Sequence, residues 1–303
     1  MKRFRRLLVA GALTAMLFTL PGCGGGDAPA ASSSGSNGVA SSSAPPEPVV
    51  VEPAYYHPLT GVGMDEDLSR LRPVAVMIND LKAAQPQLGV SQADIIYEMP
   101  AEGGITRMVA IFQSLDGVGN LGSIRSTRAY YLELALGHDA LLVHAGGSPE
   151  AYKDIPAWGV DNMDGVNGGS DAKIFWRDAE RRRTKGYEHS LLTSGEKIQA
   201  YLDQGHFRTE HKDGYAESLR FRDDGTPQGG TAAGKVSMHF SQYKTAVFDY
   251  DAASGKYLVS QFGEAYIDGN TGEQVGVTNV LALKTRIRLI SGDTAGRMTA
   301  DLT

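Results

Sequence analysis

Apolar residues in the first part of the chain fall into short runs that predict a sheet. Residues 74–78 form a continuous apolar run, VAVMI, which is typical of a strand buried on both faces. Residues 94–98 and 108–112 are two further strand candidates, and residues 140–144 form a fourth short apolar run. Polar residues and glycines separate these runs, as expected where strands end in turns.

Two helices are predicted between and after these strands. Apolar residues from Arg128 to Leu136 have the spacing of one helical face. Ser148, followed by Pro149 and Glu150, predicts a second helix, with serine as the N-cap and proline as the first helical residue. Strands that alternate with helices favour an α/β or α+β domain, with a central sheet and flanking helices.

The character of the chain changes after this region. Residues 223–235, DDGTPQGGTAAGK, have the composition of a loop or linker. Beyond them polar and apolar residues alternate, and residues 251–255 and 268–272 have the composition of hairpin turns. The sequence predicts no further strand after the turn-like residues Ser291 to Asp293. The predicted domains are an α/β domain over residues 55–222 and a smaller β-rich domain over residues 231–303.

The first 22 residues have the layout of a secretory signal. Four basic residues precede an apolar run from Leu7 to Leu20, which is too short to span about 30 Å of hydrocarbon comfortably. The following Leu20-Pro21-Gly22-Cys23 resembles a bacterial lipobox. We therefore predict a signal peptide over residues 1–22 and lipidation of Cys23, which is the only cysteine and leaves no disulfide framework to build.

A flexible tether is predicted over residues 23–54. Glycine, alanine, serine and proline dominate it, and it has too few large apolar residues to order itself by burial. Diacylation of the Cys23 thiol together with acylation of its amine would supply the two or more chains that stable anchoring needs. We therefore expect an extracytoplasmic protein that is anchored to a membrane through its lipid.

The charge of the chain limits its partners. The formal net charge is −6, and residues 1–22 carry four positive charges and no acids, so the mature chain is more acidic still. An acidic protein is a poor binder of nucleic acid, which we do not expect as a partner. Any anion site must therefore be local and made by clustered arginines.

Paired carboxylates at a turn are the first candidate site. Glu98 ends a predicted strand, Glu102 lies in a Gly-Gly turn, and Arg107 begins the next strand. Two carboxyl groups can do general acid/base work when their environments push their pKa values apart. The alternative is a hairpin held by salt bridges.

Arginines at a predicted helix start are the second candidate site. Arg125 and Arg128 flank Ser126, a predicted N-cap, in the stretch GSIRSTR. Guanidinium groups and the free N–H groups of a helix start both suit oxyanions such as phosphate or carboxylate. The alternative is that both arginines pair with a nearby acid, namely Glu98, Glu102 or Glu133.

Two further clusters complete the candidate residues. His144 closes a strand before the glycines that precede Ser148, and it is either a proton shuttle or a hydrogen-bonded core residue. Trp176 can stack on a sugar ring while the neighbouring Arg177 binds a negative charge on the same sugar. His189 lies in the polar stretch that follows them, at residues 187–190. The arginines at 181–183 are expected to form a solvated helix face.

Neither a metal nor a cofactor is expected. His206 and His211 are five residues apart, off the i, i+4 helical face, and the chain has no second cysteine and no H-E-x-x-H pattern.

Five motifs give the chain a family resemblance. They are residues 72–78, 91–98, 102–107, 122–128 and 144–150. On these motifs the chain resembles the YerB-like family of bacterial lipoproteins, whose defining domain has no settled function, over about residues 57–303. The resemblance implies an envelope lipoprotein with two domains. The family usually has Pro-His-Asn where this chain has Glu188-His189-Ser190. Its members tend to continue past residue 303, so the chain is either a fragment or has an incomplete last domain.

Three functions remain open at this point. The first is a binding module that holds an anionic envelope molecule, such as a peptidoglycan stem or a phosphate-bearing polymer, with Trp176 stacked on a sugar. The second is a hydrolase of the same polymer, with Glu98 or Glu102 as general acid/base and His144 as proton shuttle. The third is a scaffold of an envelope complex, in which the polar clusters are structural.

Overall fold

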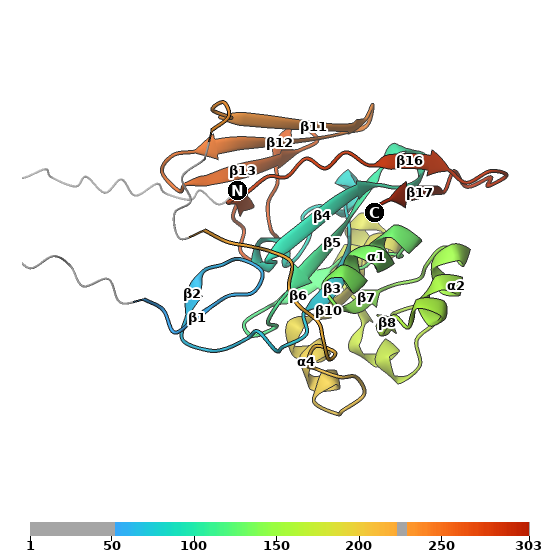
Figure 1. The fold of residues 1–303 in the computed structure, drawn as a ribbon. Coiled ribbons are helices and arrows are strands. Elements are labelled where there is room, and N and C mark those ends of the chain that lie inside the picture. The colour runs from blue at the N-terminus through green and yellow to red at the C-terminus, as the bar shows by residue number, and fades with distance from the viewer. Residues whose placement is uncertain (1–51, 223–228, 303) are drawn as a thin grey trace, which may run out of the picture. The chain divides into compact units, whose positions relative to one another are not determined.

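A mixed five-stranded sheet lies at the centre of the computed structural model, which describes residues 52–222 and 229–302 (Figure 1). The predicted signal peptide, Cys23 and most of the tether lie outside these residues. Along the sheet the order is β4 (Ile95–Pro100), β5 (Thr106–Phe112), β3 (Val74–Asn79), β7 (Leu141–His144) and β8 (Asn162–Asp164). Strand β3 is antiparallel to β5 and parallel to β7. The carboxyl ends of β3, β4, β7 and β8 therefore lie at one edge of the sheet.

Both faces of this sheet are buried, which explains the continuous apolar run in β3. Val76 and Ile78 belong to one hydrophobic core, whereas Ala75 and Met77, which point to the opposite face, belong to another. Helices α1 (Ala129–Gly137) and α2 (Pro149–Trp158) contribute to the second core (Figure 1). The first core takes side chains from α4 (Gly195–Leu202) and from the C-terminal strands.

The start of α2 confirms a local prediction. The Ser148 hydroxyl accepts a hydrogen bond from the Ala151 N–H at 3.1 Å, and Pro149 is the first helical residue. Capping of this kind depends only on residues within one helical turn, so the sequence pattern was sufficient to predict where α2 begins.

A second, three-stranded sheet lies beside helix α3. Its order is β6 (Asn120–Gly122), β10 (Leu191–Ser194) and β9 (Trp176–Arg177), and α3 spans Ala179–Lys185. Arg181 in α3 is buried and donates to three backbone carbonyls. The expectation of a solvated arginine face is therefore wrong for Arg181, although Arg182 and Arg183 are exposed.

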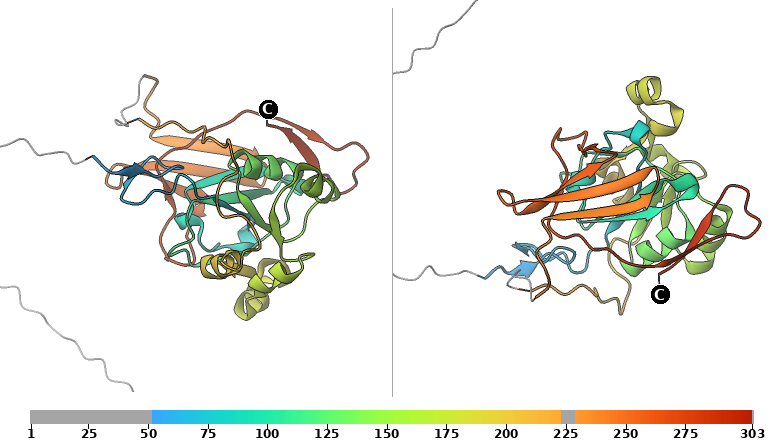
Figure 2. Two further views of the ribbon diagram at one scale, coloured as in Figure 1. Left: turned by 60° about the horizontal axis from the view of Figure 1, so that its bottom comes forward. Right: turned by 90° about the horizontal axis from the view of Figure 1, so that it is seen from above.

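The C-terminal part is rich in antiparallel strands, as predicted (Figure 2). Both predicted turns form, with the Gly255 N–H donating to the Asp251 carbonyl and the Gly272 N–H donating to the Asp268 carbonyl. The strands are β11 (Lys235–Ser241), β12 (Lys244–Asp251), β13 (Lys256–Gln261), β14 (Glu264–Ala265), β15 (Gly276–Val277), β16 (Arg286–Leu289) and β17 (Met298–Asp301). The last two pair with each other, so the expectation of no strand after the turn at residue 293 is wrong.

The β-rich part is docked on the rest of the chain, and the described residues 52–222 and 229–302 belong to one compact unit. The Asp268 carboxylate accepts hydrogen bonds from the Gly89 N–H and from both the N–H and the hydroxyl of Ser91. The Ser241 hydroxyl donates to the Gly104 carbonyl. The smaller elements are β1 (Tyr55–Tyr56), β2 (Gly63–Met64) and the 3₁₀ turns Lys82–Ala84, Val90–Gln92, Glu102–Gly104, Ser170–Ile174 and Tyr187–His189. No helix within residues 52–222 or 229–302 is long and apolar enough to cross a membrane.

Candidate functional site

The polar segments singled out in the sequence meet at the carboxyl edge of the central sheet. The Ala145 N–H donates to the Arg125 carbonyl, and the Thr127 N–H donates to the Gly146 carbonyl. Residues 125–127 therefore lie beside the loop that follows β7. We use the term arginine rim for the side chains of Arg107, Arg125, Arg128 and Arg177 at this edge.

Glu102 forms ion pairs with two arginines of the rim. The Arg128 Nε lies 2.5 Å from Glu102 Oε1 and its Nη2 lies 2.8 Å from Oε2, which is a bidentate pair. Arg107 Nη2 lies 3.5 Å from the same Oε2. Burial raises the pKa of Glu102, but Arg128 and Arg107 outweigh it, and the pKa is lowered overall. Glu102 is therefore an ionised partner of the arginines rather than a free acid or base.

Arg107 has an incomplete set of partners. Its Nη1 donates to the Ser126 carbonyl at 3.1 Å, while its buried Nε has no hydrogen-bond partner among the described residues. Burial, followed by the positive charge of Arg128, lowers the pKa of Arg107 to about 10. The rim therefore holds more positive charge than Glu102 neutralises.

Arg125 lies next to Arg107 and Arg128, and its own contacts are long. Its Nη1 donates to the Glu188 carbonyl at 3.3 Å, and its Nη2 lies 3.7 Å from the Glu188 carboxylate, which is largely exposed. Burial lowers the pKa of Arg125, and the neighbouring Arg128 and Arg177 act in the same direction. Among the described residues Arg128 forms its predicted ion pair with Glu102, Arg107 pairs with Glu102 as the salt-bridged hairpin predicts, and Arg125 pairs with none of the predicted acids.

The two serines of the site do not present free hydroxyl groups at helix starts. Helix α1 begins at Ala129 with Arg128 at the N-cap position, so the prediction of Ser126 as the N-cap is wrong. Ser126 instead supplies the backbone carbonyl that Arg107 contacts. The hydroxyl of Ser148 is already used to cap α2.

Glu98 lies in a buried cluster with residues that sequence reasoning missed. Lys244 Nζ, from β12, lies 2.6 Å from Asp80 Oδ2 and 3.1 Å from Glu98 Oε1. The Thr106 hydroxyl is within 2.8 Å of both carboxylates. Burial, followed by the negative charge of Asp80, raises the pKa of Glu98 to about 8. At neutral pH Glu98 is therefore mostly protonated, and Lys244 pairs mainly with Asp80.

We expect Glu98→Gln to remove a pH dependence of stability. An unfolded glutamate loses its proton at about pH 4.3, whereas Glu98 in the fold loses it near pH 8. Between these values the folded state holds one more proton than the unfolded state, so stability falls as pH rises. The variant should match the parent near pH 5 and exceed it by about 2–4 kcal/mol near pH 8, because one pKa unit corresponds to about 1.4 kcal/mol.

Urea unfolding at both pH values measures this difference. Glu264→Gln is the control, since that carboxylate is exposed and pairs with the exposed Lys82. If the free energy of unfolding changed with pH equally in the parent and in Glu98→Gln, the protonation of Glu98 in the fold would be contradicted.

His144 is completely buried, and both of its ring nitrogens are already engaged. Nδ1 lies 2.9 Å from the Gly146 carbonyl oxygen and Nε2 lies 3.0 Å from Asn162 Oδ1. No hydrogen bond joins His144 to Glu98 or Glu102 in the described structure. The ring therefore offers no free nitrogen for a proton shuttle.

The predicted aromatic–arginine pair is arranged differently from expectation. Arg177 stacks on the ring of Tyr187, with its Cζ 3.5 Å from the ring centroid, and donates to the Tyr187 carbonyl. Trp176 instead lies next to Lys197 Nζ, 5.6 Å from the ring centroid. Adjacent strand residues point to opposite faces, which explains why Trp176 and Arg177 separate.

His189 is buried beside the rim. Its Nδ1 lies 2.9 Å from the Asn79 side-chain amide nitrogen, which can donate a hydrogen bond to it. Burial lowers the pKa of His189, and the nearby charge of Arg125 lowers it further. His189 is therefore a neutral side chain near neutral pH, and it joins β3 to the Tyr187–His189 turn.

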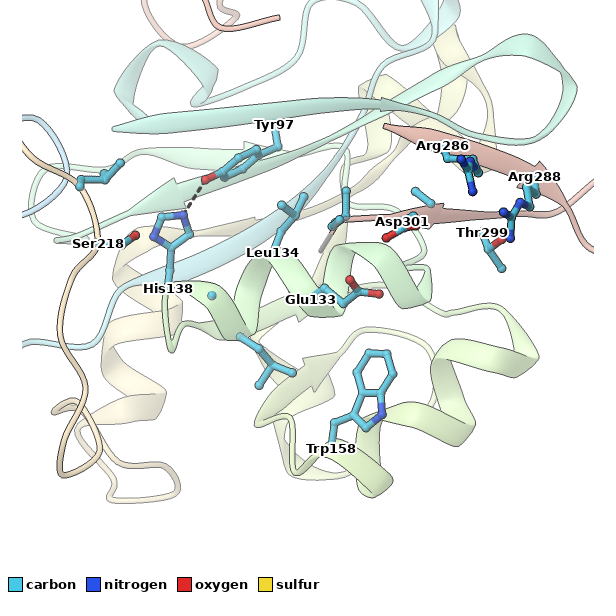
Figure 3. Close-up of a pocket in the computed structure, with 15 residues that line it drawn as sticks. Tyr97, Glu133, Leu134, His138, Trp158, Ser218, Arg286, Arg288, Thr299 and Asp301 are labelled. Carbon is cyan, nitrogen blue, oxygen red and sulfur yellow. Dashed lines mark hydrogen bonds between the residues drawn. The ribbon is translucent and has the colours of Figure 1, made fainter. Parts of the chain in front are cut away.

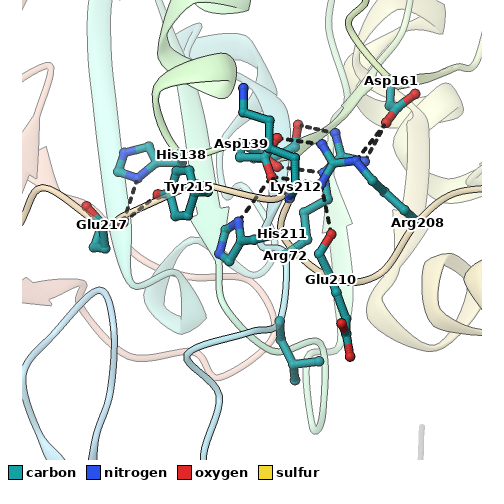
Figure 4. Close-up of polar contacts among 12 residues, drawn as sticks. Arg72, His138, Asp139, Asp161, Arg208, Glu210, His211, Lys212, Tyr215 and Glu217 are labelled. Carbon is teal, nitrogen blue, oxygen red and sulfur yellow. Dashed lines mark hydrogen bonds and ion pairs between the residues drawn. The ribbon is translucent and has the colours of Figure 1, made fainter.

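A second polar network, centred on Asp139, had no signal in the sequence (Figure 4). Arg208 donates to both carboxylate oxygens of Asp139, at 2.7 and 2.5 Å, and His211 Nδ1 lies 3.2 Å from Oδ2. The Lys212 N–H donates to the same Oδ2. The network ties residues 208–212 to the turn between α1 and β7. No group of three or more metal-binding side chains occurs within the described parts of the chain.

Comparison with known proteins gives the family. Residues 59–208 match the model described as the N-terminal domain of a protein of unknown function, DUF3048, and residues 236–303 match the model of its C-terminal domain. The chain belongs to the DUF3048 family. A Bacillus subtilis protein, YerB, that is named as a lipoprotein is 32% identical over 247 residues, which are 81% of this chain and 71% of that protein. The crystal structure of the YerB protein matches with a TM-score of 0.68 at 29% identity, covering 82% of this chain and 80% of that chain.

The comparisons confirm the predicted resemblance and the predicted fold class. A DUF3048 protein has the two-domain order that the motifs implied, and the relative shares the mixed α/β fold. The name of YerB supports an envelope location for the family. The signal peptide over residues 1–22 and the lipidation of Cys23 stay predictions, and neither match assigns an activity.

Proposed function

We propose that this DUF3048 protein is a membrane-anchored envelope lipoprotein that binds an anionic cell-wall component at the arginine rim. The observation that carries the proposal is the surplus of positive charge. Within the described residues Glu102 is the partly buried carboxylate shared by Arg107 and Arg128, and the acid near Arg125 is the exposed Glu188 at 3.7 Å. A planar guanidinium binds carboxylate or phosphate through charge-assisted hydrogen bonds, so a ligand oxyanion can replace the Glu188 contact of Arg125.

Tyr187 extends the rim toward a ligand that carries a sugar. Tyr187 is more than half exposed, and Arg177 covers one face of its ring. An exposed aromatic ring beside a guanidinium can contact the apolar face of a sugar and hold a neighbouring charge. Tyr187 therefore takes the role that sequence reasoning assigned to Trp176.

The contacts give less support to a hydrolase. Glu98 is enclosed by Asp80 and Lys244, and Glu102 is held by Arg128. His144 has both nitrogens occupied. A general acid or base must reach the reacting atoms of the substrate, and these three side chains already have partners within the protein. A purely structural role remains the main competitor, and a binding measurement separates it from the proposal.

We expect Arg125→Ala and Arg177→Ala each to weaken binding of phosphate- or carboxylate-bearing cell-wall fragments about tenfold or more. A charge-assisted hydrogen bond contributes about 1.5–3 kcal/mol, which supports that magnitude. Calorimetric titration of the purified protein with peptidoglycan digests and with a phosphate-bearing wall polymer measures the effect. Arg128 is unsuitable for this test because its loss would remove the main ion-pair partner of the partly buried Glu102.

Arg183→Ala is the matched control, because it removes the same charge from an exposed residue that pairs with exposed Glu180. It should bind like the parent, and all variants should keep the parent melting temperature. Binding by Arg125→Ala at parent affinity would rule out the rim as the site. Absence of both binding and new products with the parent protein would favour the structural role.

A further inference from the structure

A groove of about 850 Å³ lies beside α1 and shares no lining residue with the arginine rim (Figure 3). We use the term α1 groove for the space between Tyr97 of β4, Leu134 of α1, Trp158 at the end of α2, and Arg286 and Arg288 of β16. None of these residues belongs to the candidate sites discussed above. A concave site that combines apolar lining with a few polar groups is the usual form of a small-molecule site.

The hairpin β16–β17 forms one wall of the α1 groove. Ala300 and Leu302 pack against the core beneath α1, which holds the hairpin in place. In the ladder Arg286 lies opposite Asp301 and Arg288 lies opposite Thr299. Residues two apart on a strand share a face, so both arginines lie on the side of the hairpin that lines the groove.

The two groove arginines differ from the other arginine of the hairpin. Arg297 is neutralised locally, with its Nη2 2.6 Å from Asp293 and its Nη1 3.7 Å from Glu150. Arg286 and Arg288 are exposed, and their side chains make no hydrogen bond or ion pair within the described part of the chain. Their charge is therefore available to a ligand.

Two carboxylates, Glu133 and Asp301, also line the groove and oppose these charges in part. Burial raises the pKa of Glu133, and the negative charges of Asp301 and Asp154 raise it further. A carboxyl group with a raised pKa takes up a proton more readily, which reduces the negative charge that faces an incoming anion.

The remaining lining is partly apolar and aromatic, and it also includes the polar residues His138, Ser218 and Thr299. Leu134 and Leu136 come from α1, and Ala300 and Leu302 come from the hairpin. Figure 3 shows the Trp158 indole apart from the two arginines, with Glu133 and Asp301 drawn between them. Trp158 is 42% exposed. A molecule lying along the groove would thus have its body against apolar side chains and one end at the guanidinium groups.

We propose that the α1 groove binds an anionic amphiphile, a molecule with a hydrocarbon body and a phosphate headgroup. The hydrocarbon lies against Leu134, Leu136 and Trp158, and the phosphate accepts hydrogen bonds from Arg286 and Arg288. Guanidinium groups are well matched to phosphate oxygens, and the apolar lining gains from removal from water. This site is separate from the arginine rim and does not depend on the function proposed for it.

Trp158 provides a direct probe of the groove. The chain has two tryptophans, and Trp176→Phe leaves Trp158 as the fluorescent one. We expect dodecyl phosphate, below its micelle concentration, to change the Trp158 emission saturably. Inorganic phosphate and an uncharged dodecyl glycoside should each bind at least about tenfold more weakly, because each offers only half of the interaction. Equal binding of either one would overturn the proposal.

Arg286→Ala combined with Arg288→Ala, in the Trp176→Phe background, tests the headgroup contact. The double variant should raise the dissociation constant for dodecyl phosphate at least about tenfold. Arg182→Ala with Arg183→Ala is the control, since it removes two exposed charges from α3 and should bind like the parent. Parent-like binding by the groove variant, or an equal loss in the control, would overturn the proposal.

A vesicle measurement distinguishes two sources of the same chemistry. Vesicles that contain an anionic phospholipid should shift the Trp158 emission, with loss in the groove variant, if the ligand is a membrane lipid. Response to monomeric dodecyl phosphate alone indicates a soluble amphiphile. Absence of response to both would overturn the site, and far-ultraviolet circular dichroism confirms that each variant is folded.

Discussion

Replacement of Lys244 by methionine is expected to lower the free energy of unfolding by about 3–5 kcal/mol. Lys244 is almost completely buried and pairs with the equally buried Asp80 at 2.6 Å. One oxygen of Asp80 already lacks a hydrogen-bond partner among the described residues. Loss of the ammonium group would leave an uncompensated carboxylate between the central sheet and β12. Urea unfolding at about pH 7 measures the change.

A double variant separates this charge effect from a loss of packing. Lys244→Met combined with Asp80→Asn removes both charges and should recover part of the lost stability, which gives the coupling energy between the two sites. Lys235→Met is the control, because Lys235 is an exposed residue of the same sheet that pairs with exposed Asp249, and it should change stability by no more than about 0.5 kcal/mol. A loss below about 1 kcal/mol for Lys244→Met would contradict the buried pair.

Asp139→Asn is expected to destabilise the protein by about 2–4 kcal/mol and to release the segment that Asp139 holds. The buried carboxylate takes two hydrogen bonds from Arg208, one from the Lys212 N–H and a contact from His211. An amide retains one oxygen and carries no charge, so it cannot satisfy all of these donors. Asparagine also tolerates the positive φ of 49° at this position, so the backbone need not change.

Two measurements test this prediction. Limited proteolysis should cut the variant near residues 208–217 more rapidly than the parent, whereas Asp213→Asn, at an exposed residue of the same segment, should behave like the parent. Burial opposes ionisation of Asp139, but Arg208 and the other donors hold its pKa far below its ordinary value. Its contribution is therefore complete above about pH 4 and is lost only as pH falls toward the folded pKa. The difference between the parent and Asp139→Asn should accordingly shrink in acid, and a constant difference would contradict the role of the charge.

Local features of the fold were predictable from the sequence. The run at residues 74–78 is continuous because β3 is buried on both faces, and the Ser148-Pro149 start of α2 depends only on neighbours within one turn. The turn at residues 251–255 is equally local. Ser126 was misplaced as an N-cap because α1 begins only at Ala129, and helix boundaries are the least certain part of such a prediction.

The sequence by itself determined which short segments carry polar chemistry and that these segments end strands. It left open which partner each charge takes. The pairing of Arg128 with Glu102 was one of the alternatives, but the pairing of Glu98 and Asp80 with Lys244 depends on residues up to 164 positions apart. Only the tertiary structure decides such pairs, because docking of β12 against the central sheet excludes water there, and a buried charge must then find its partner in the protein.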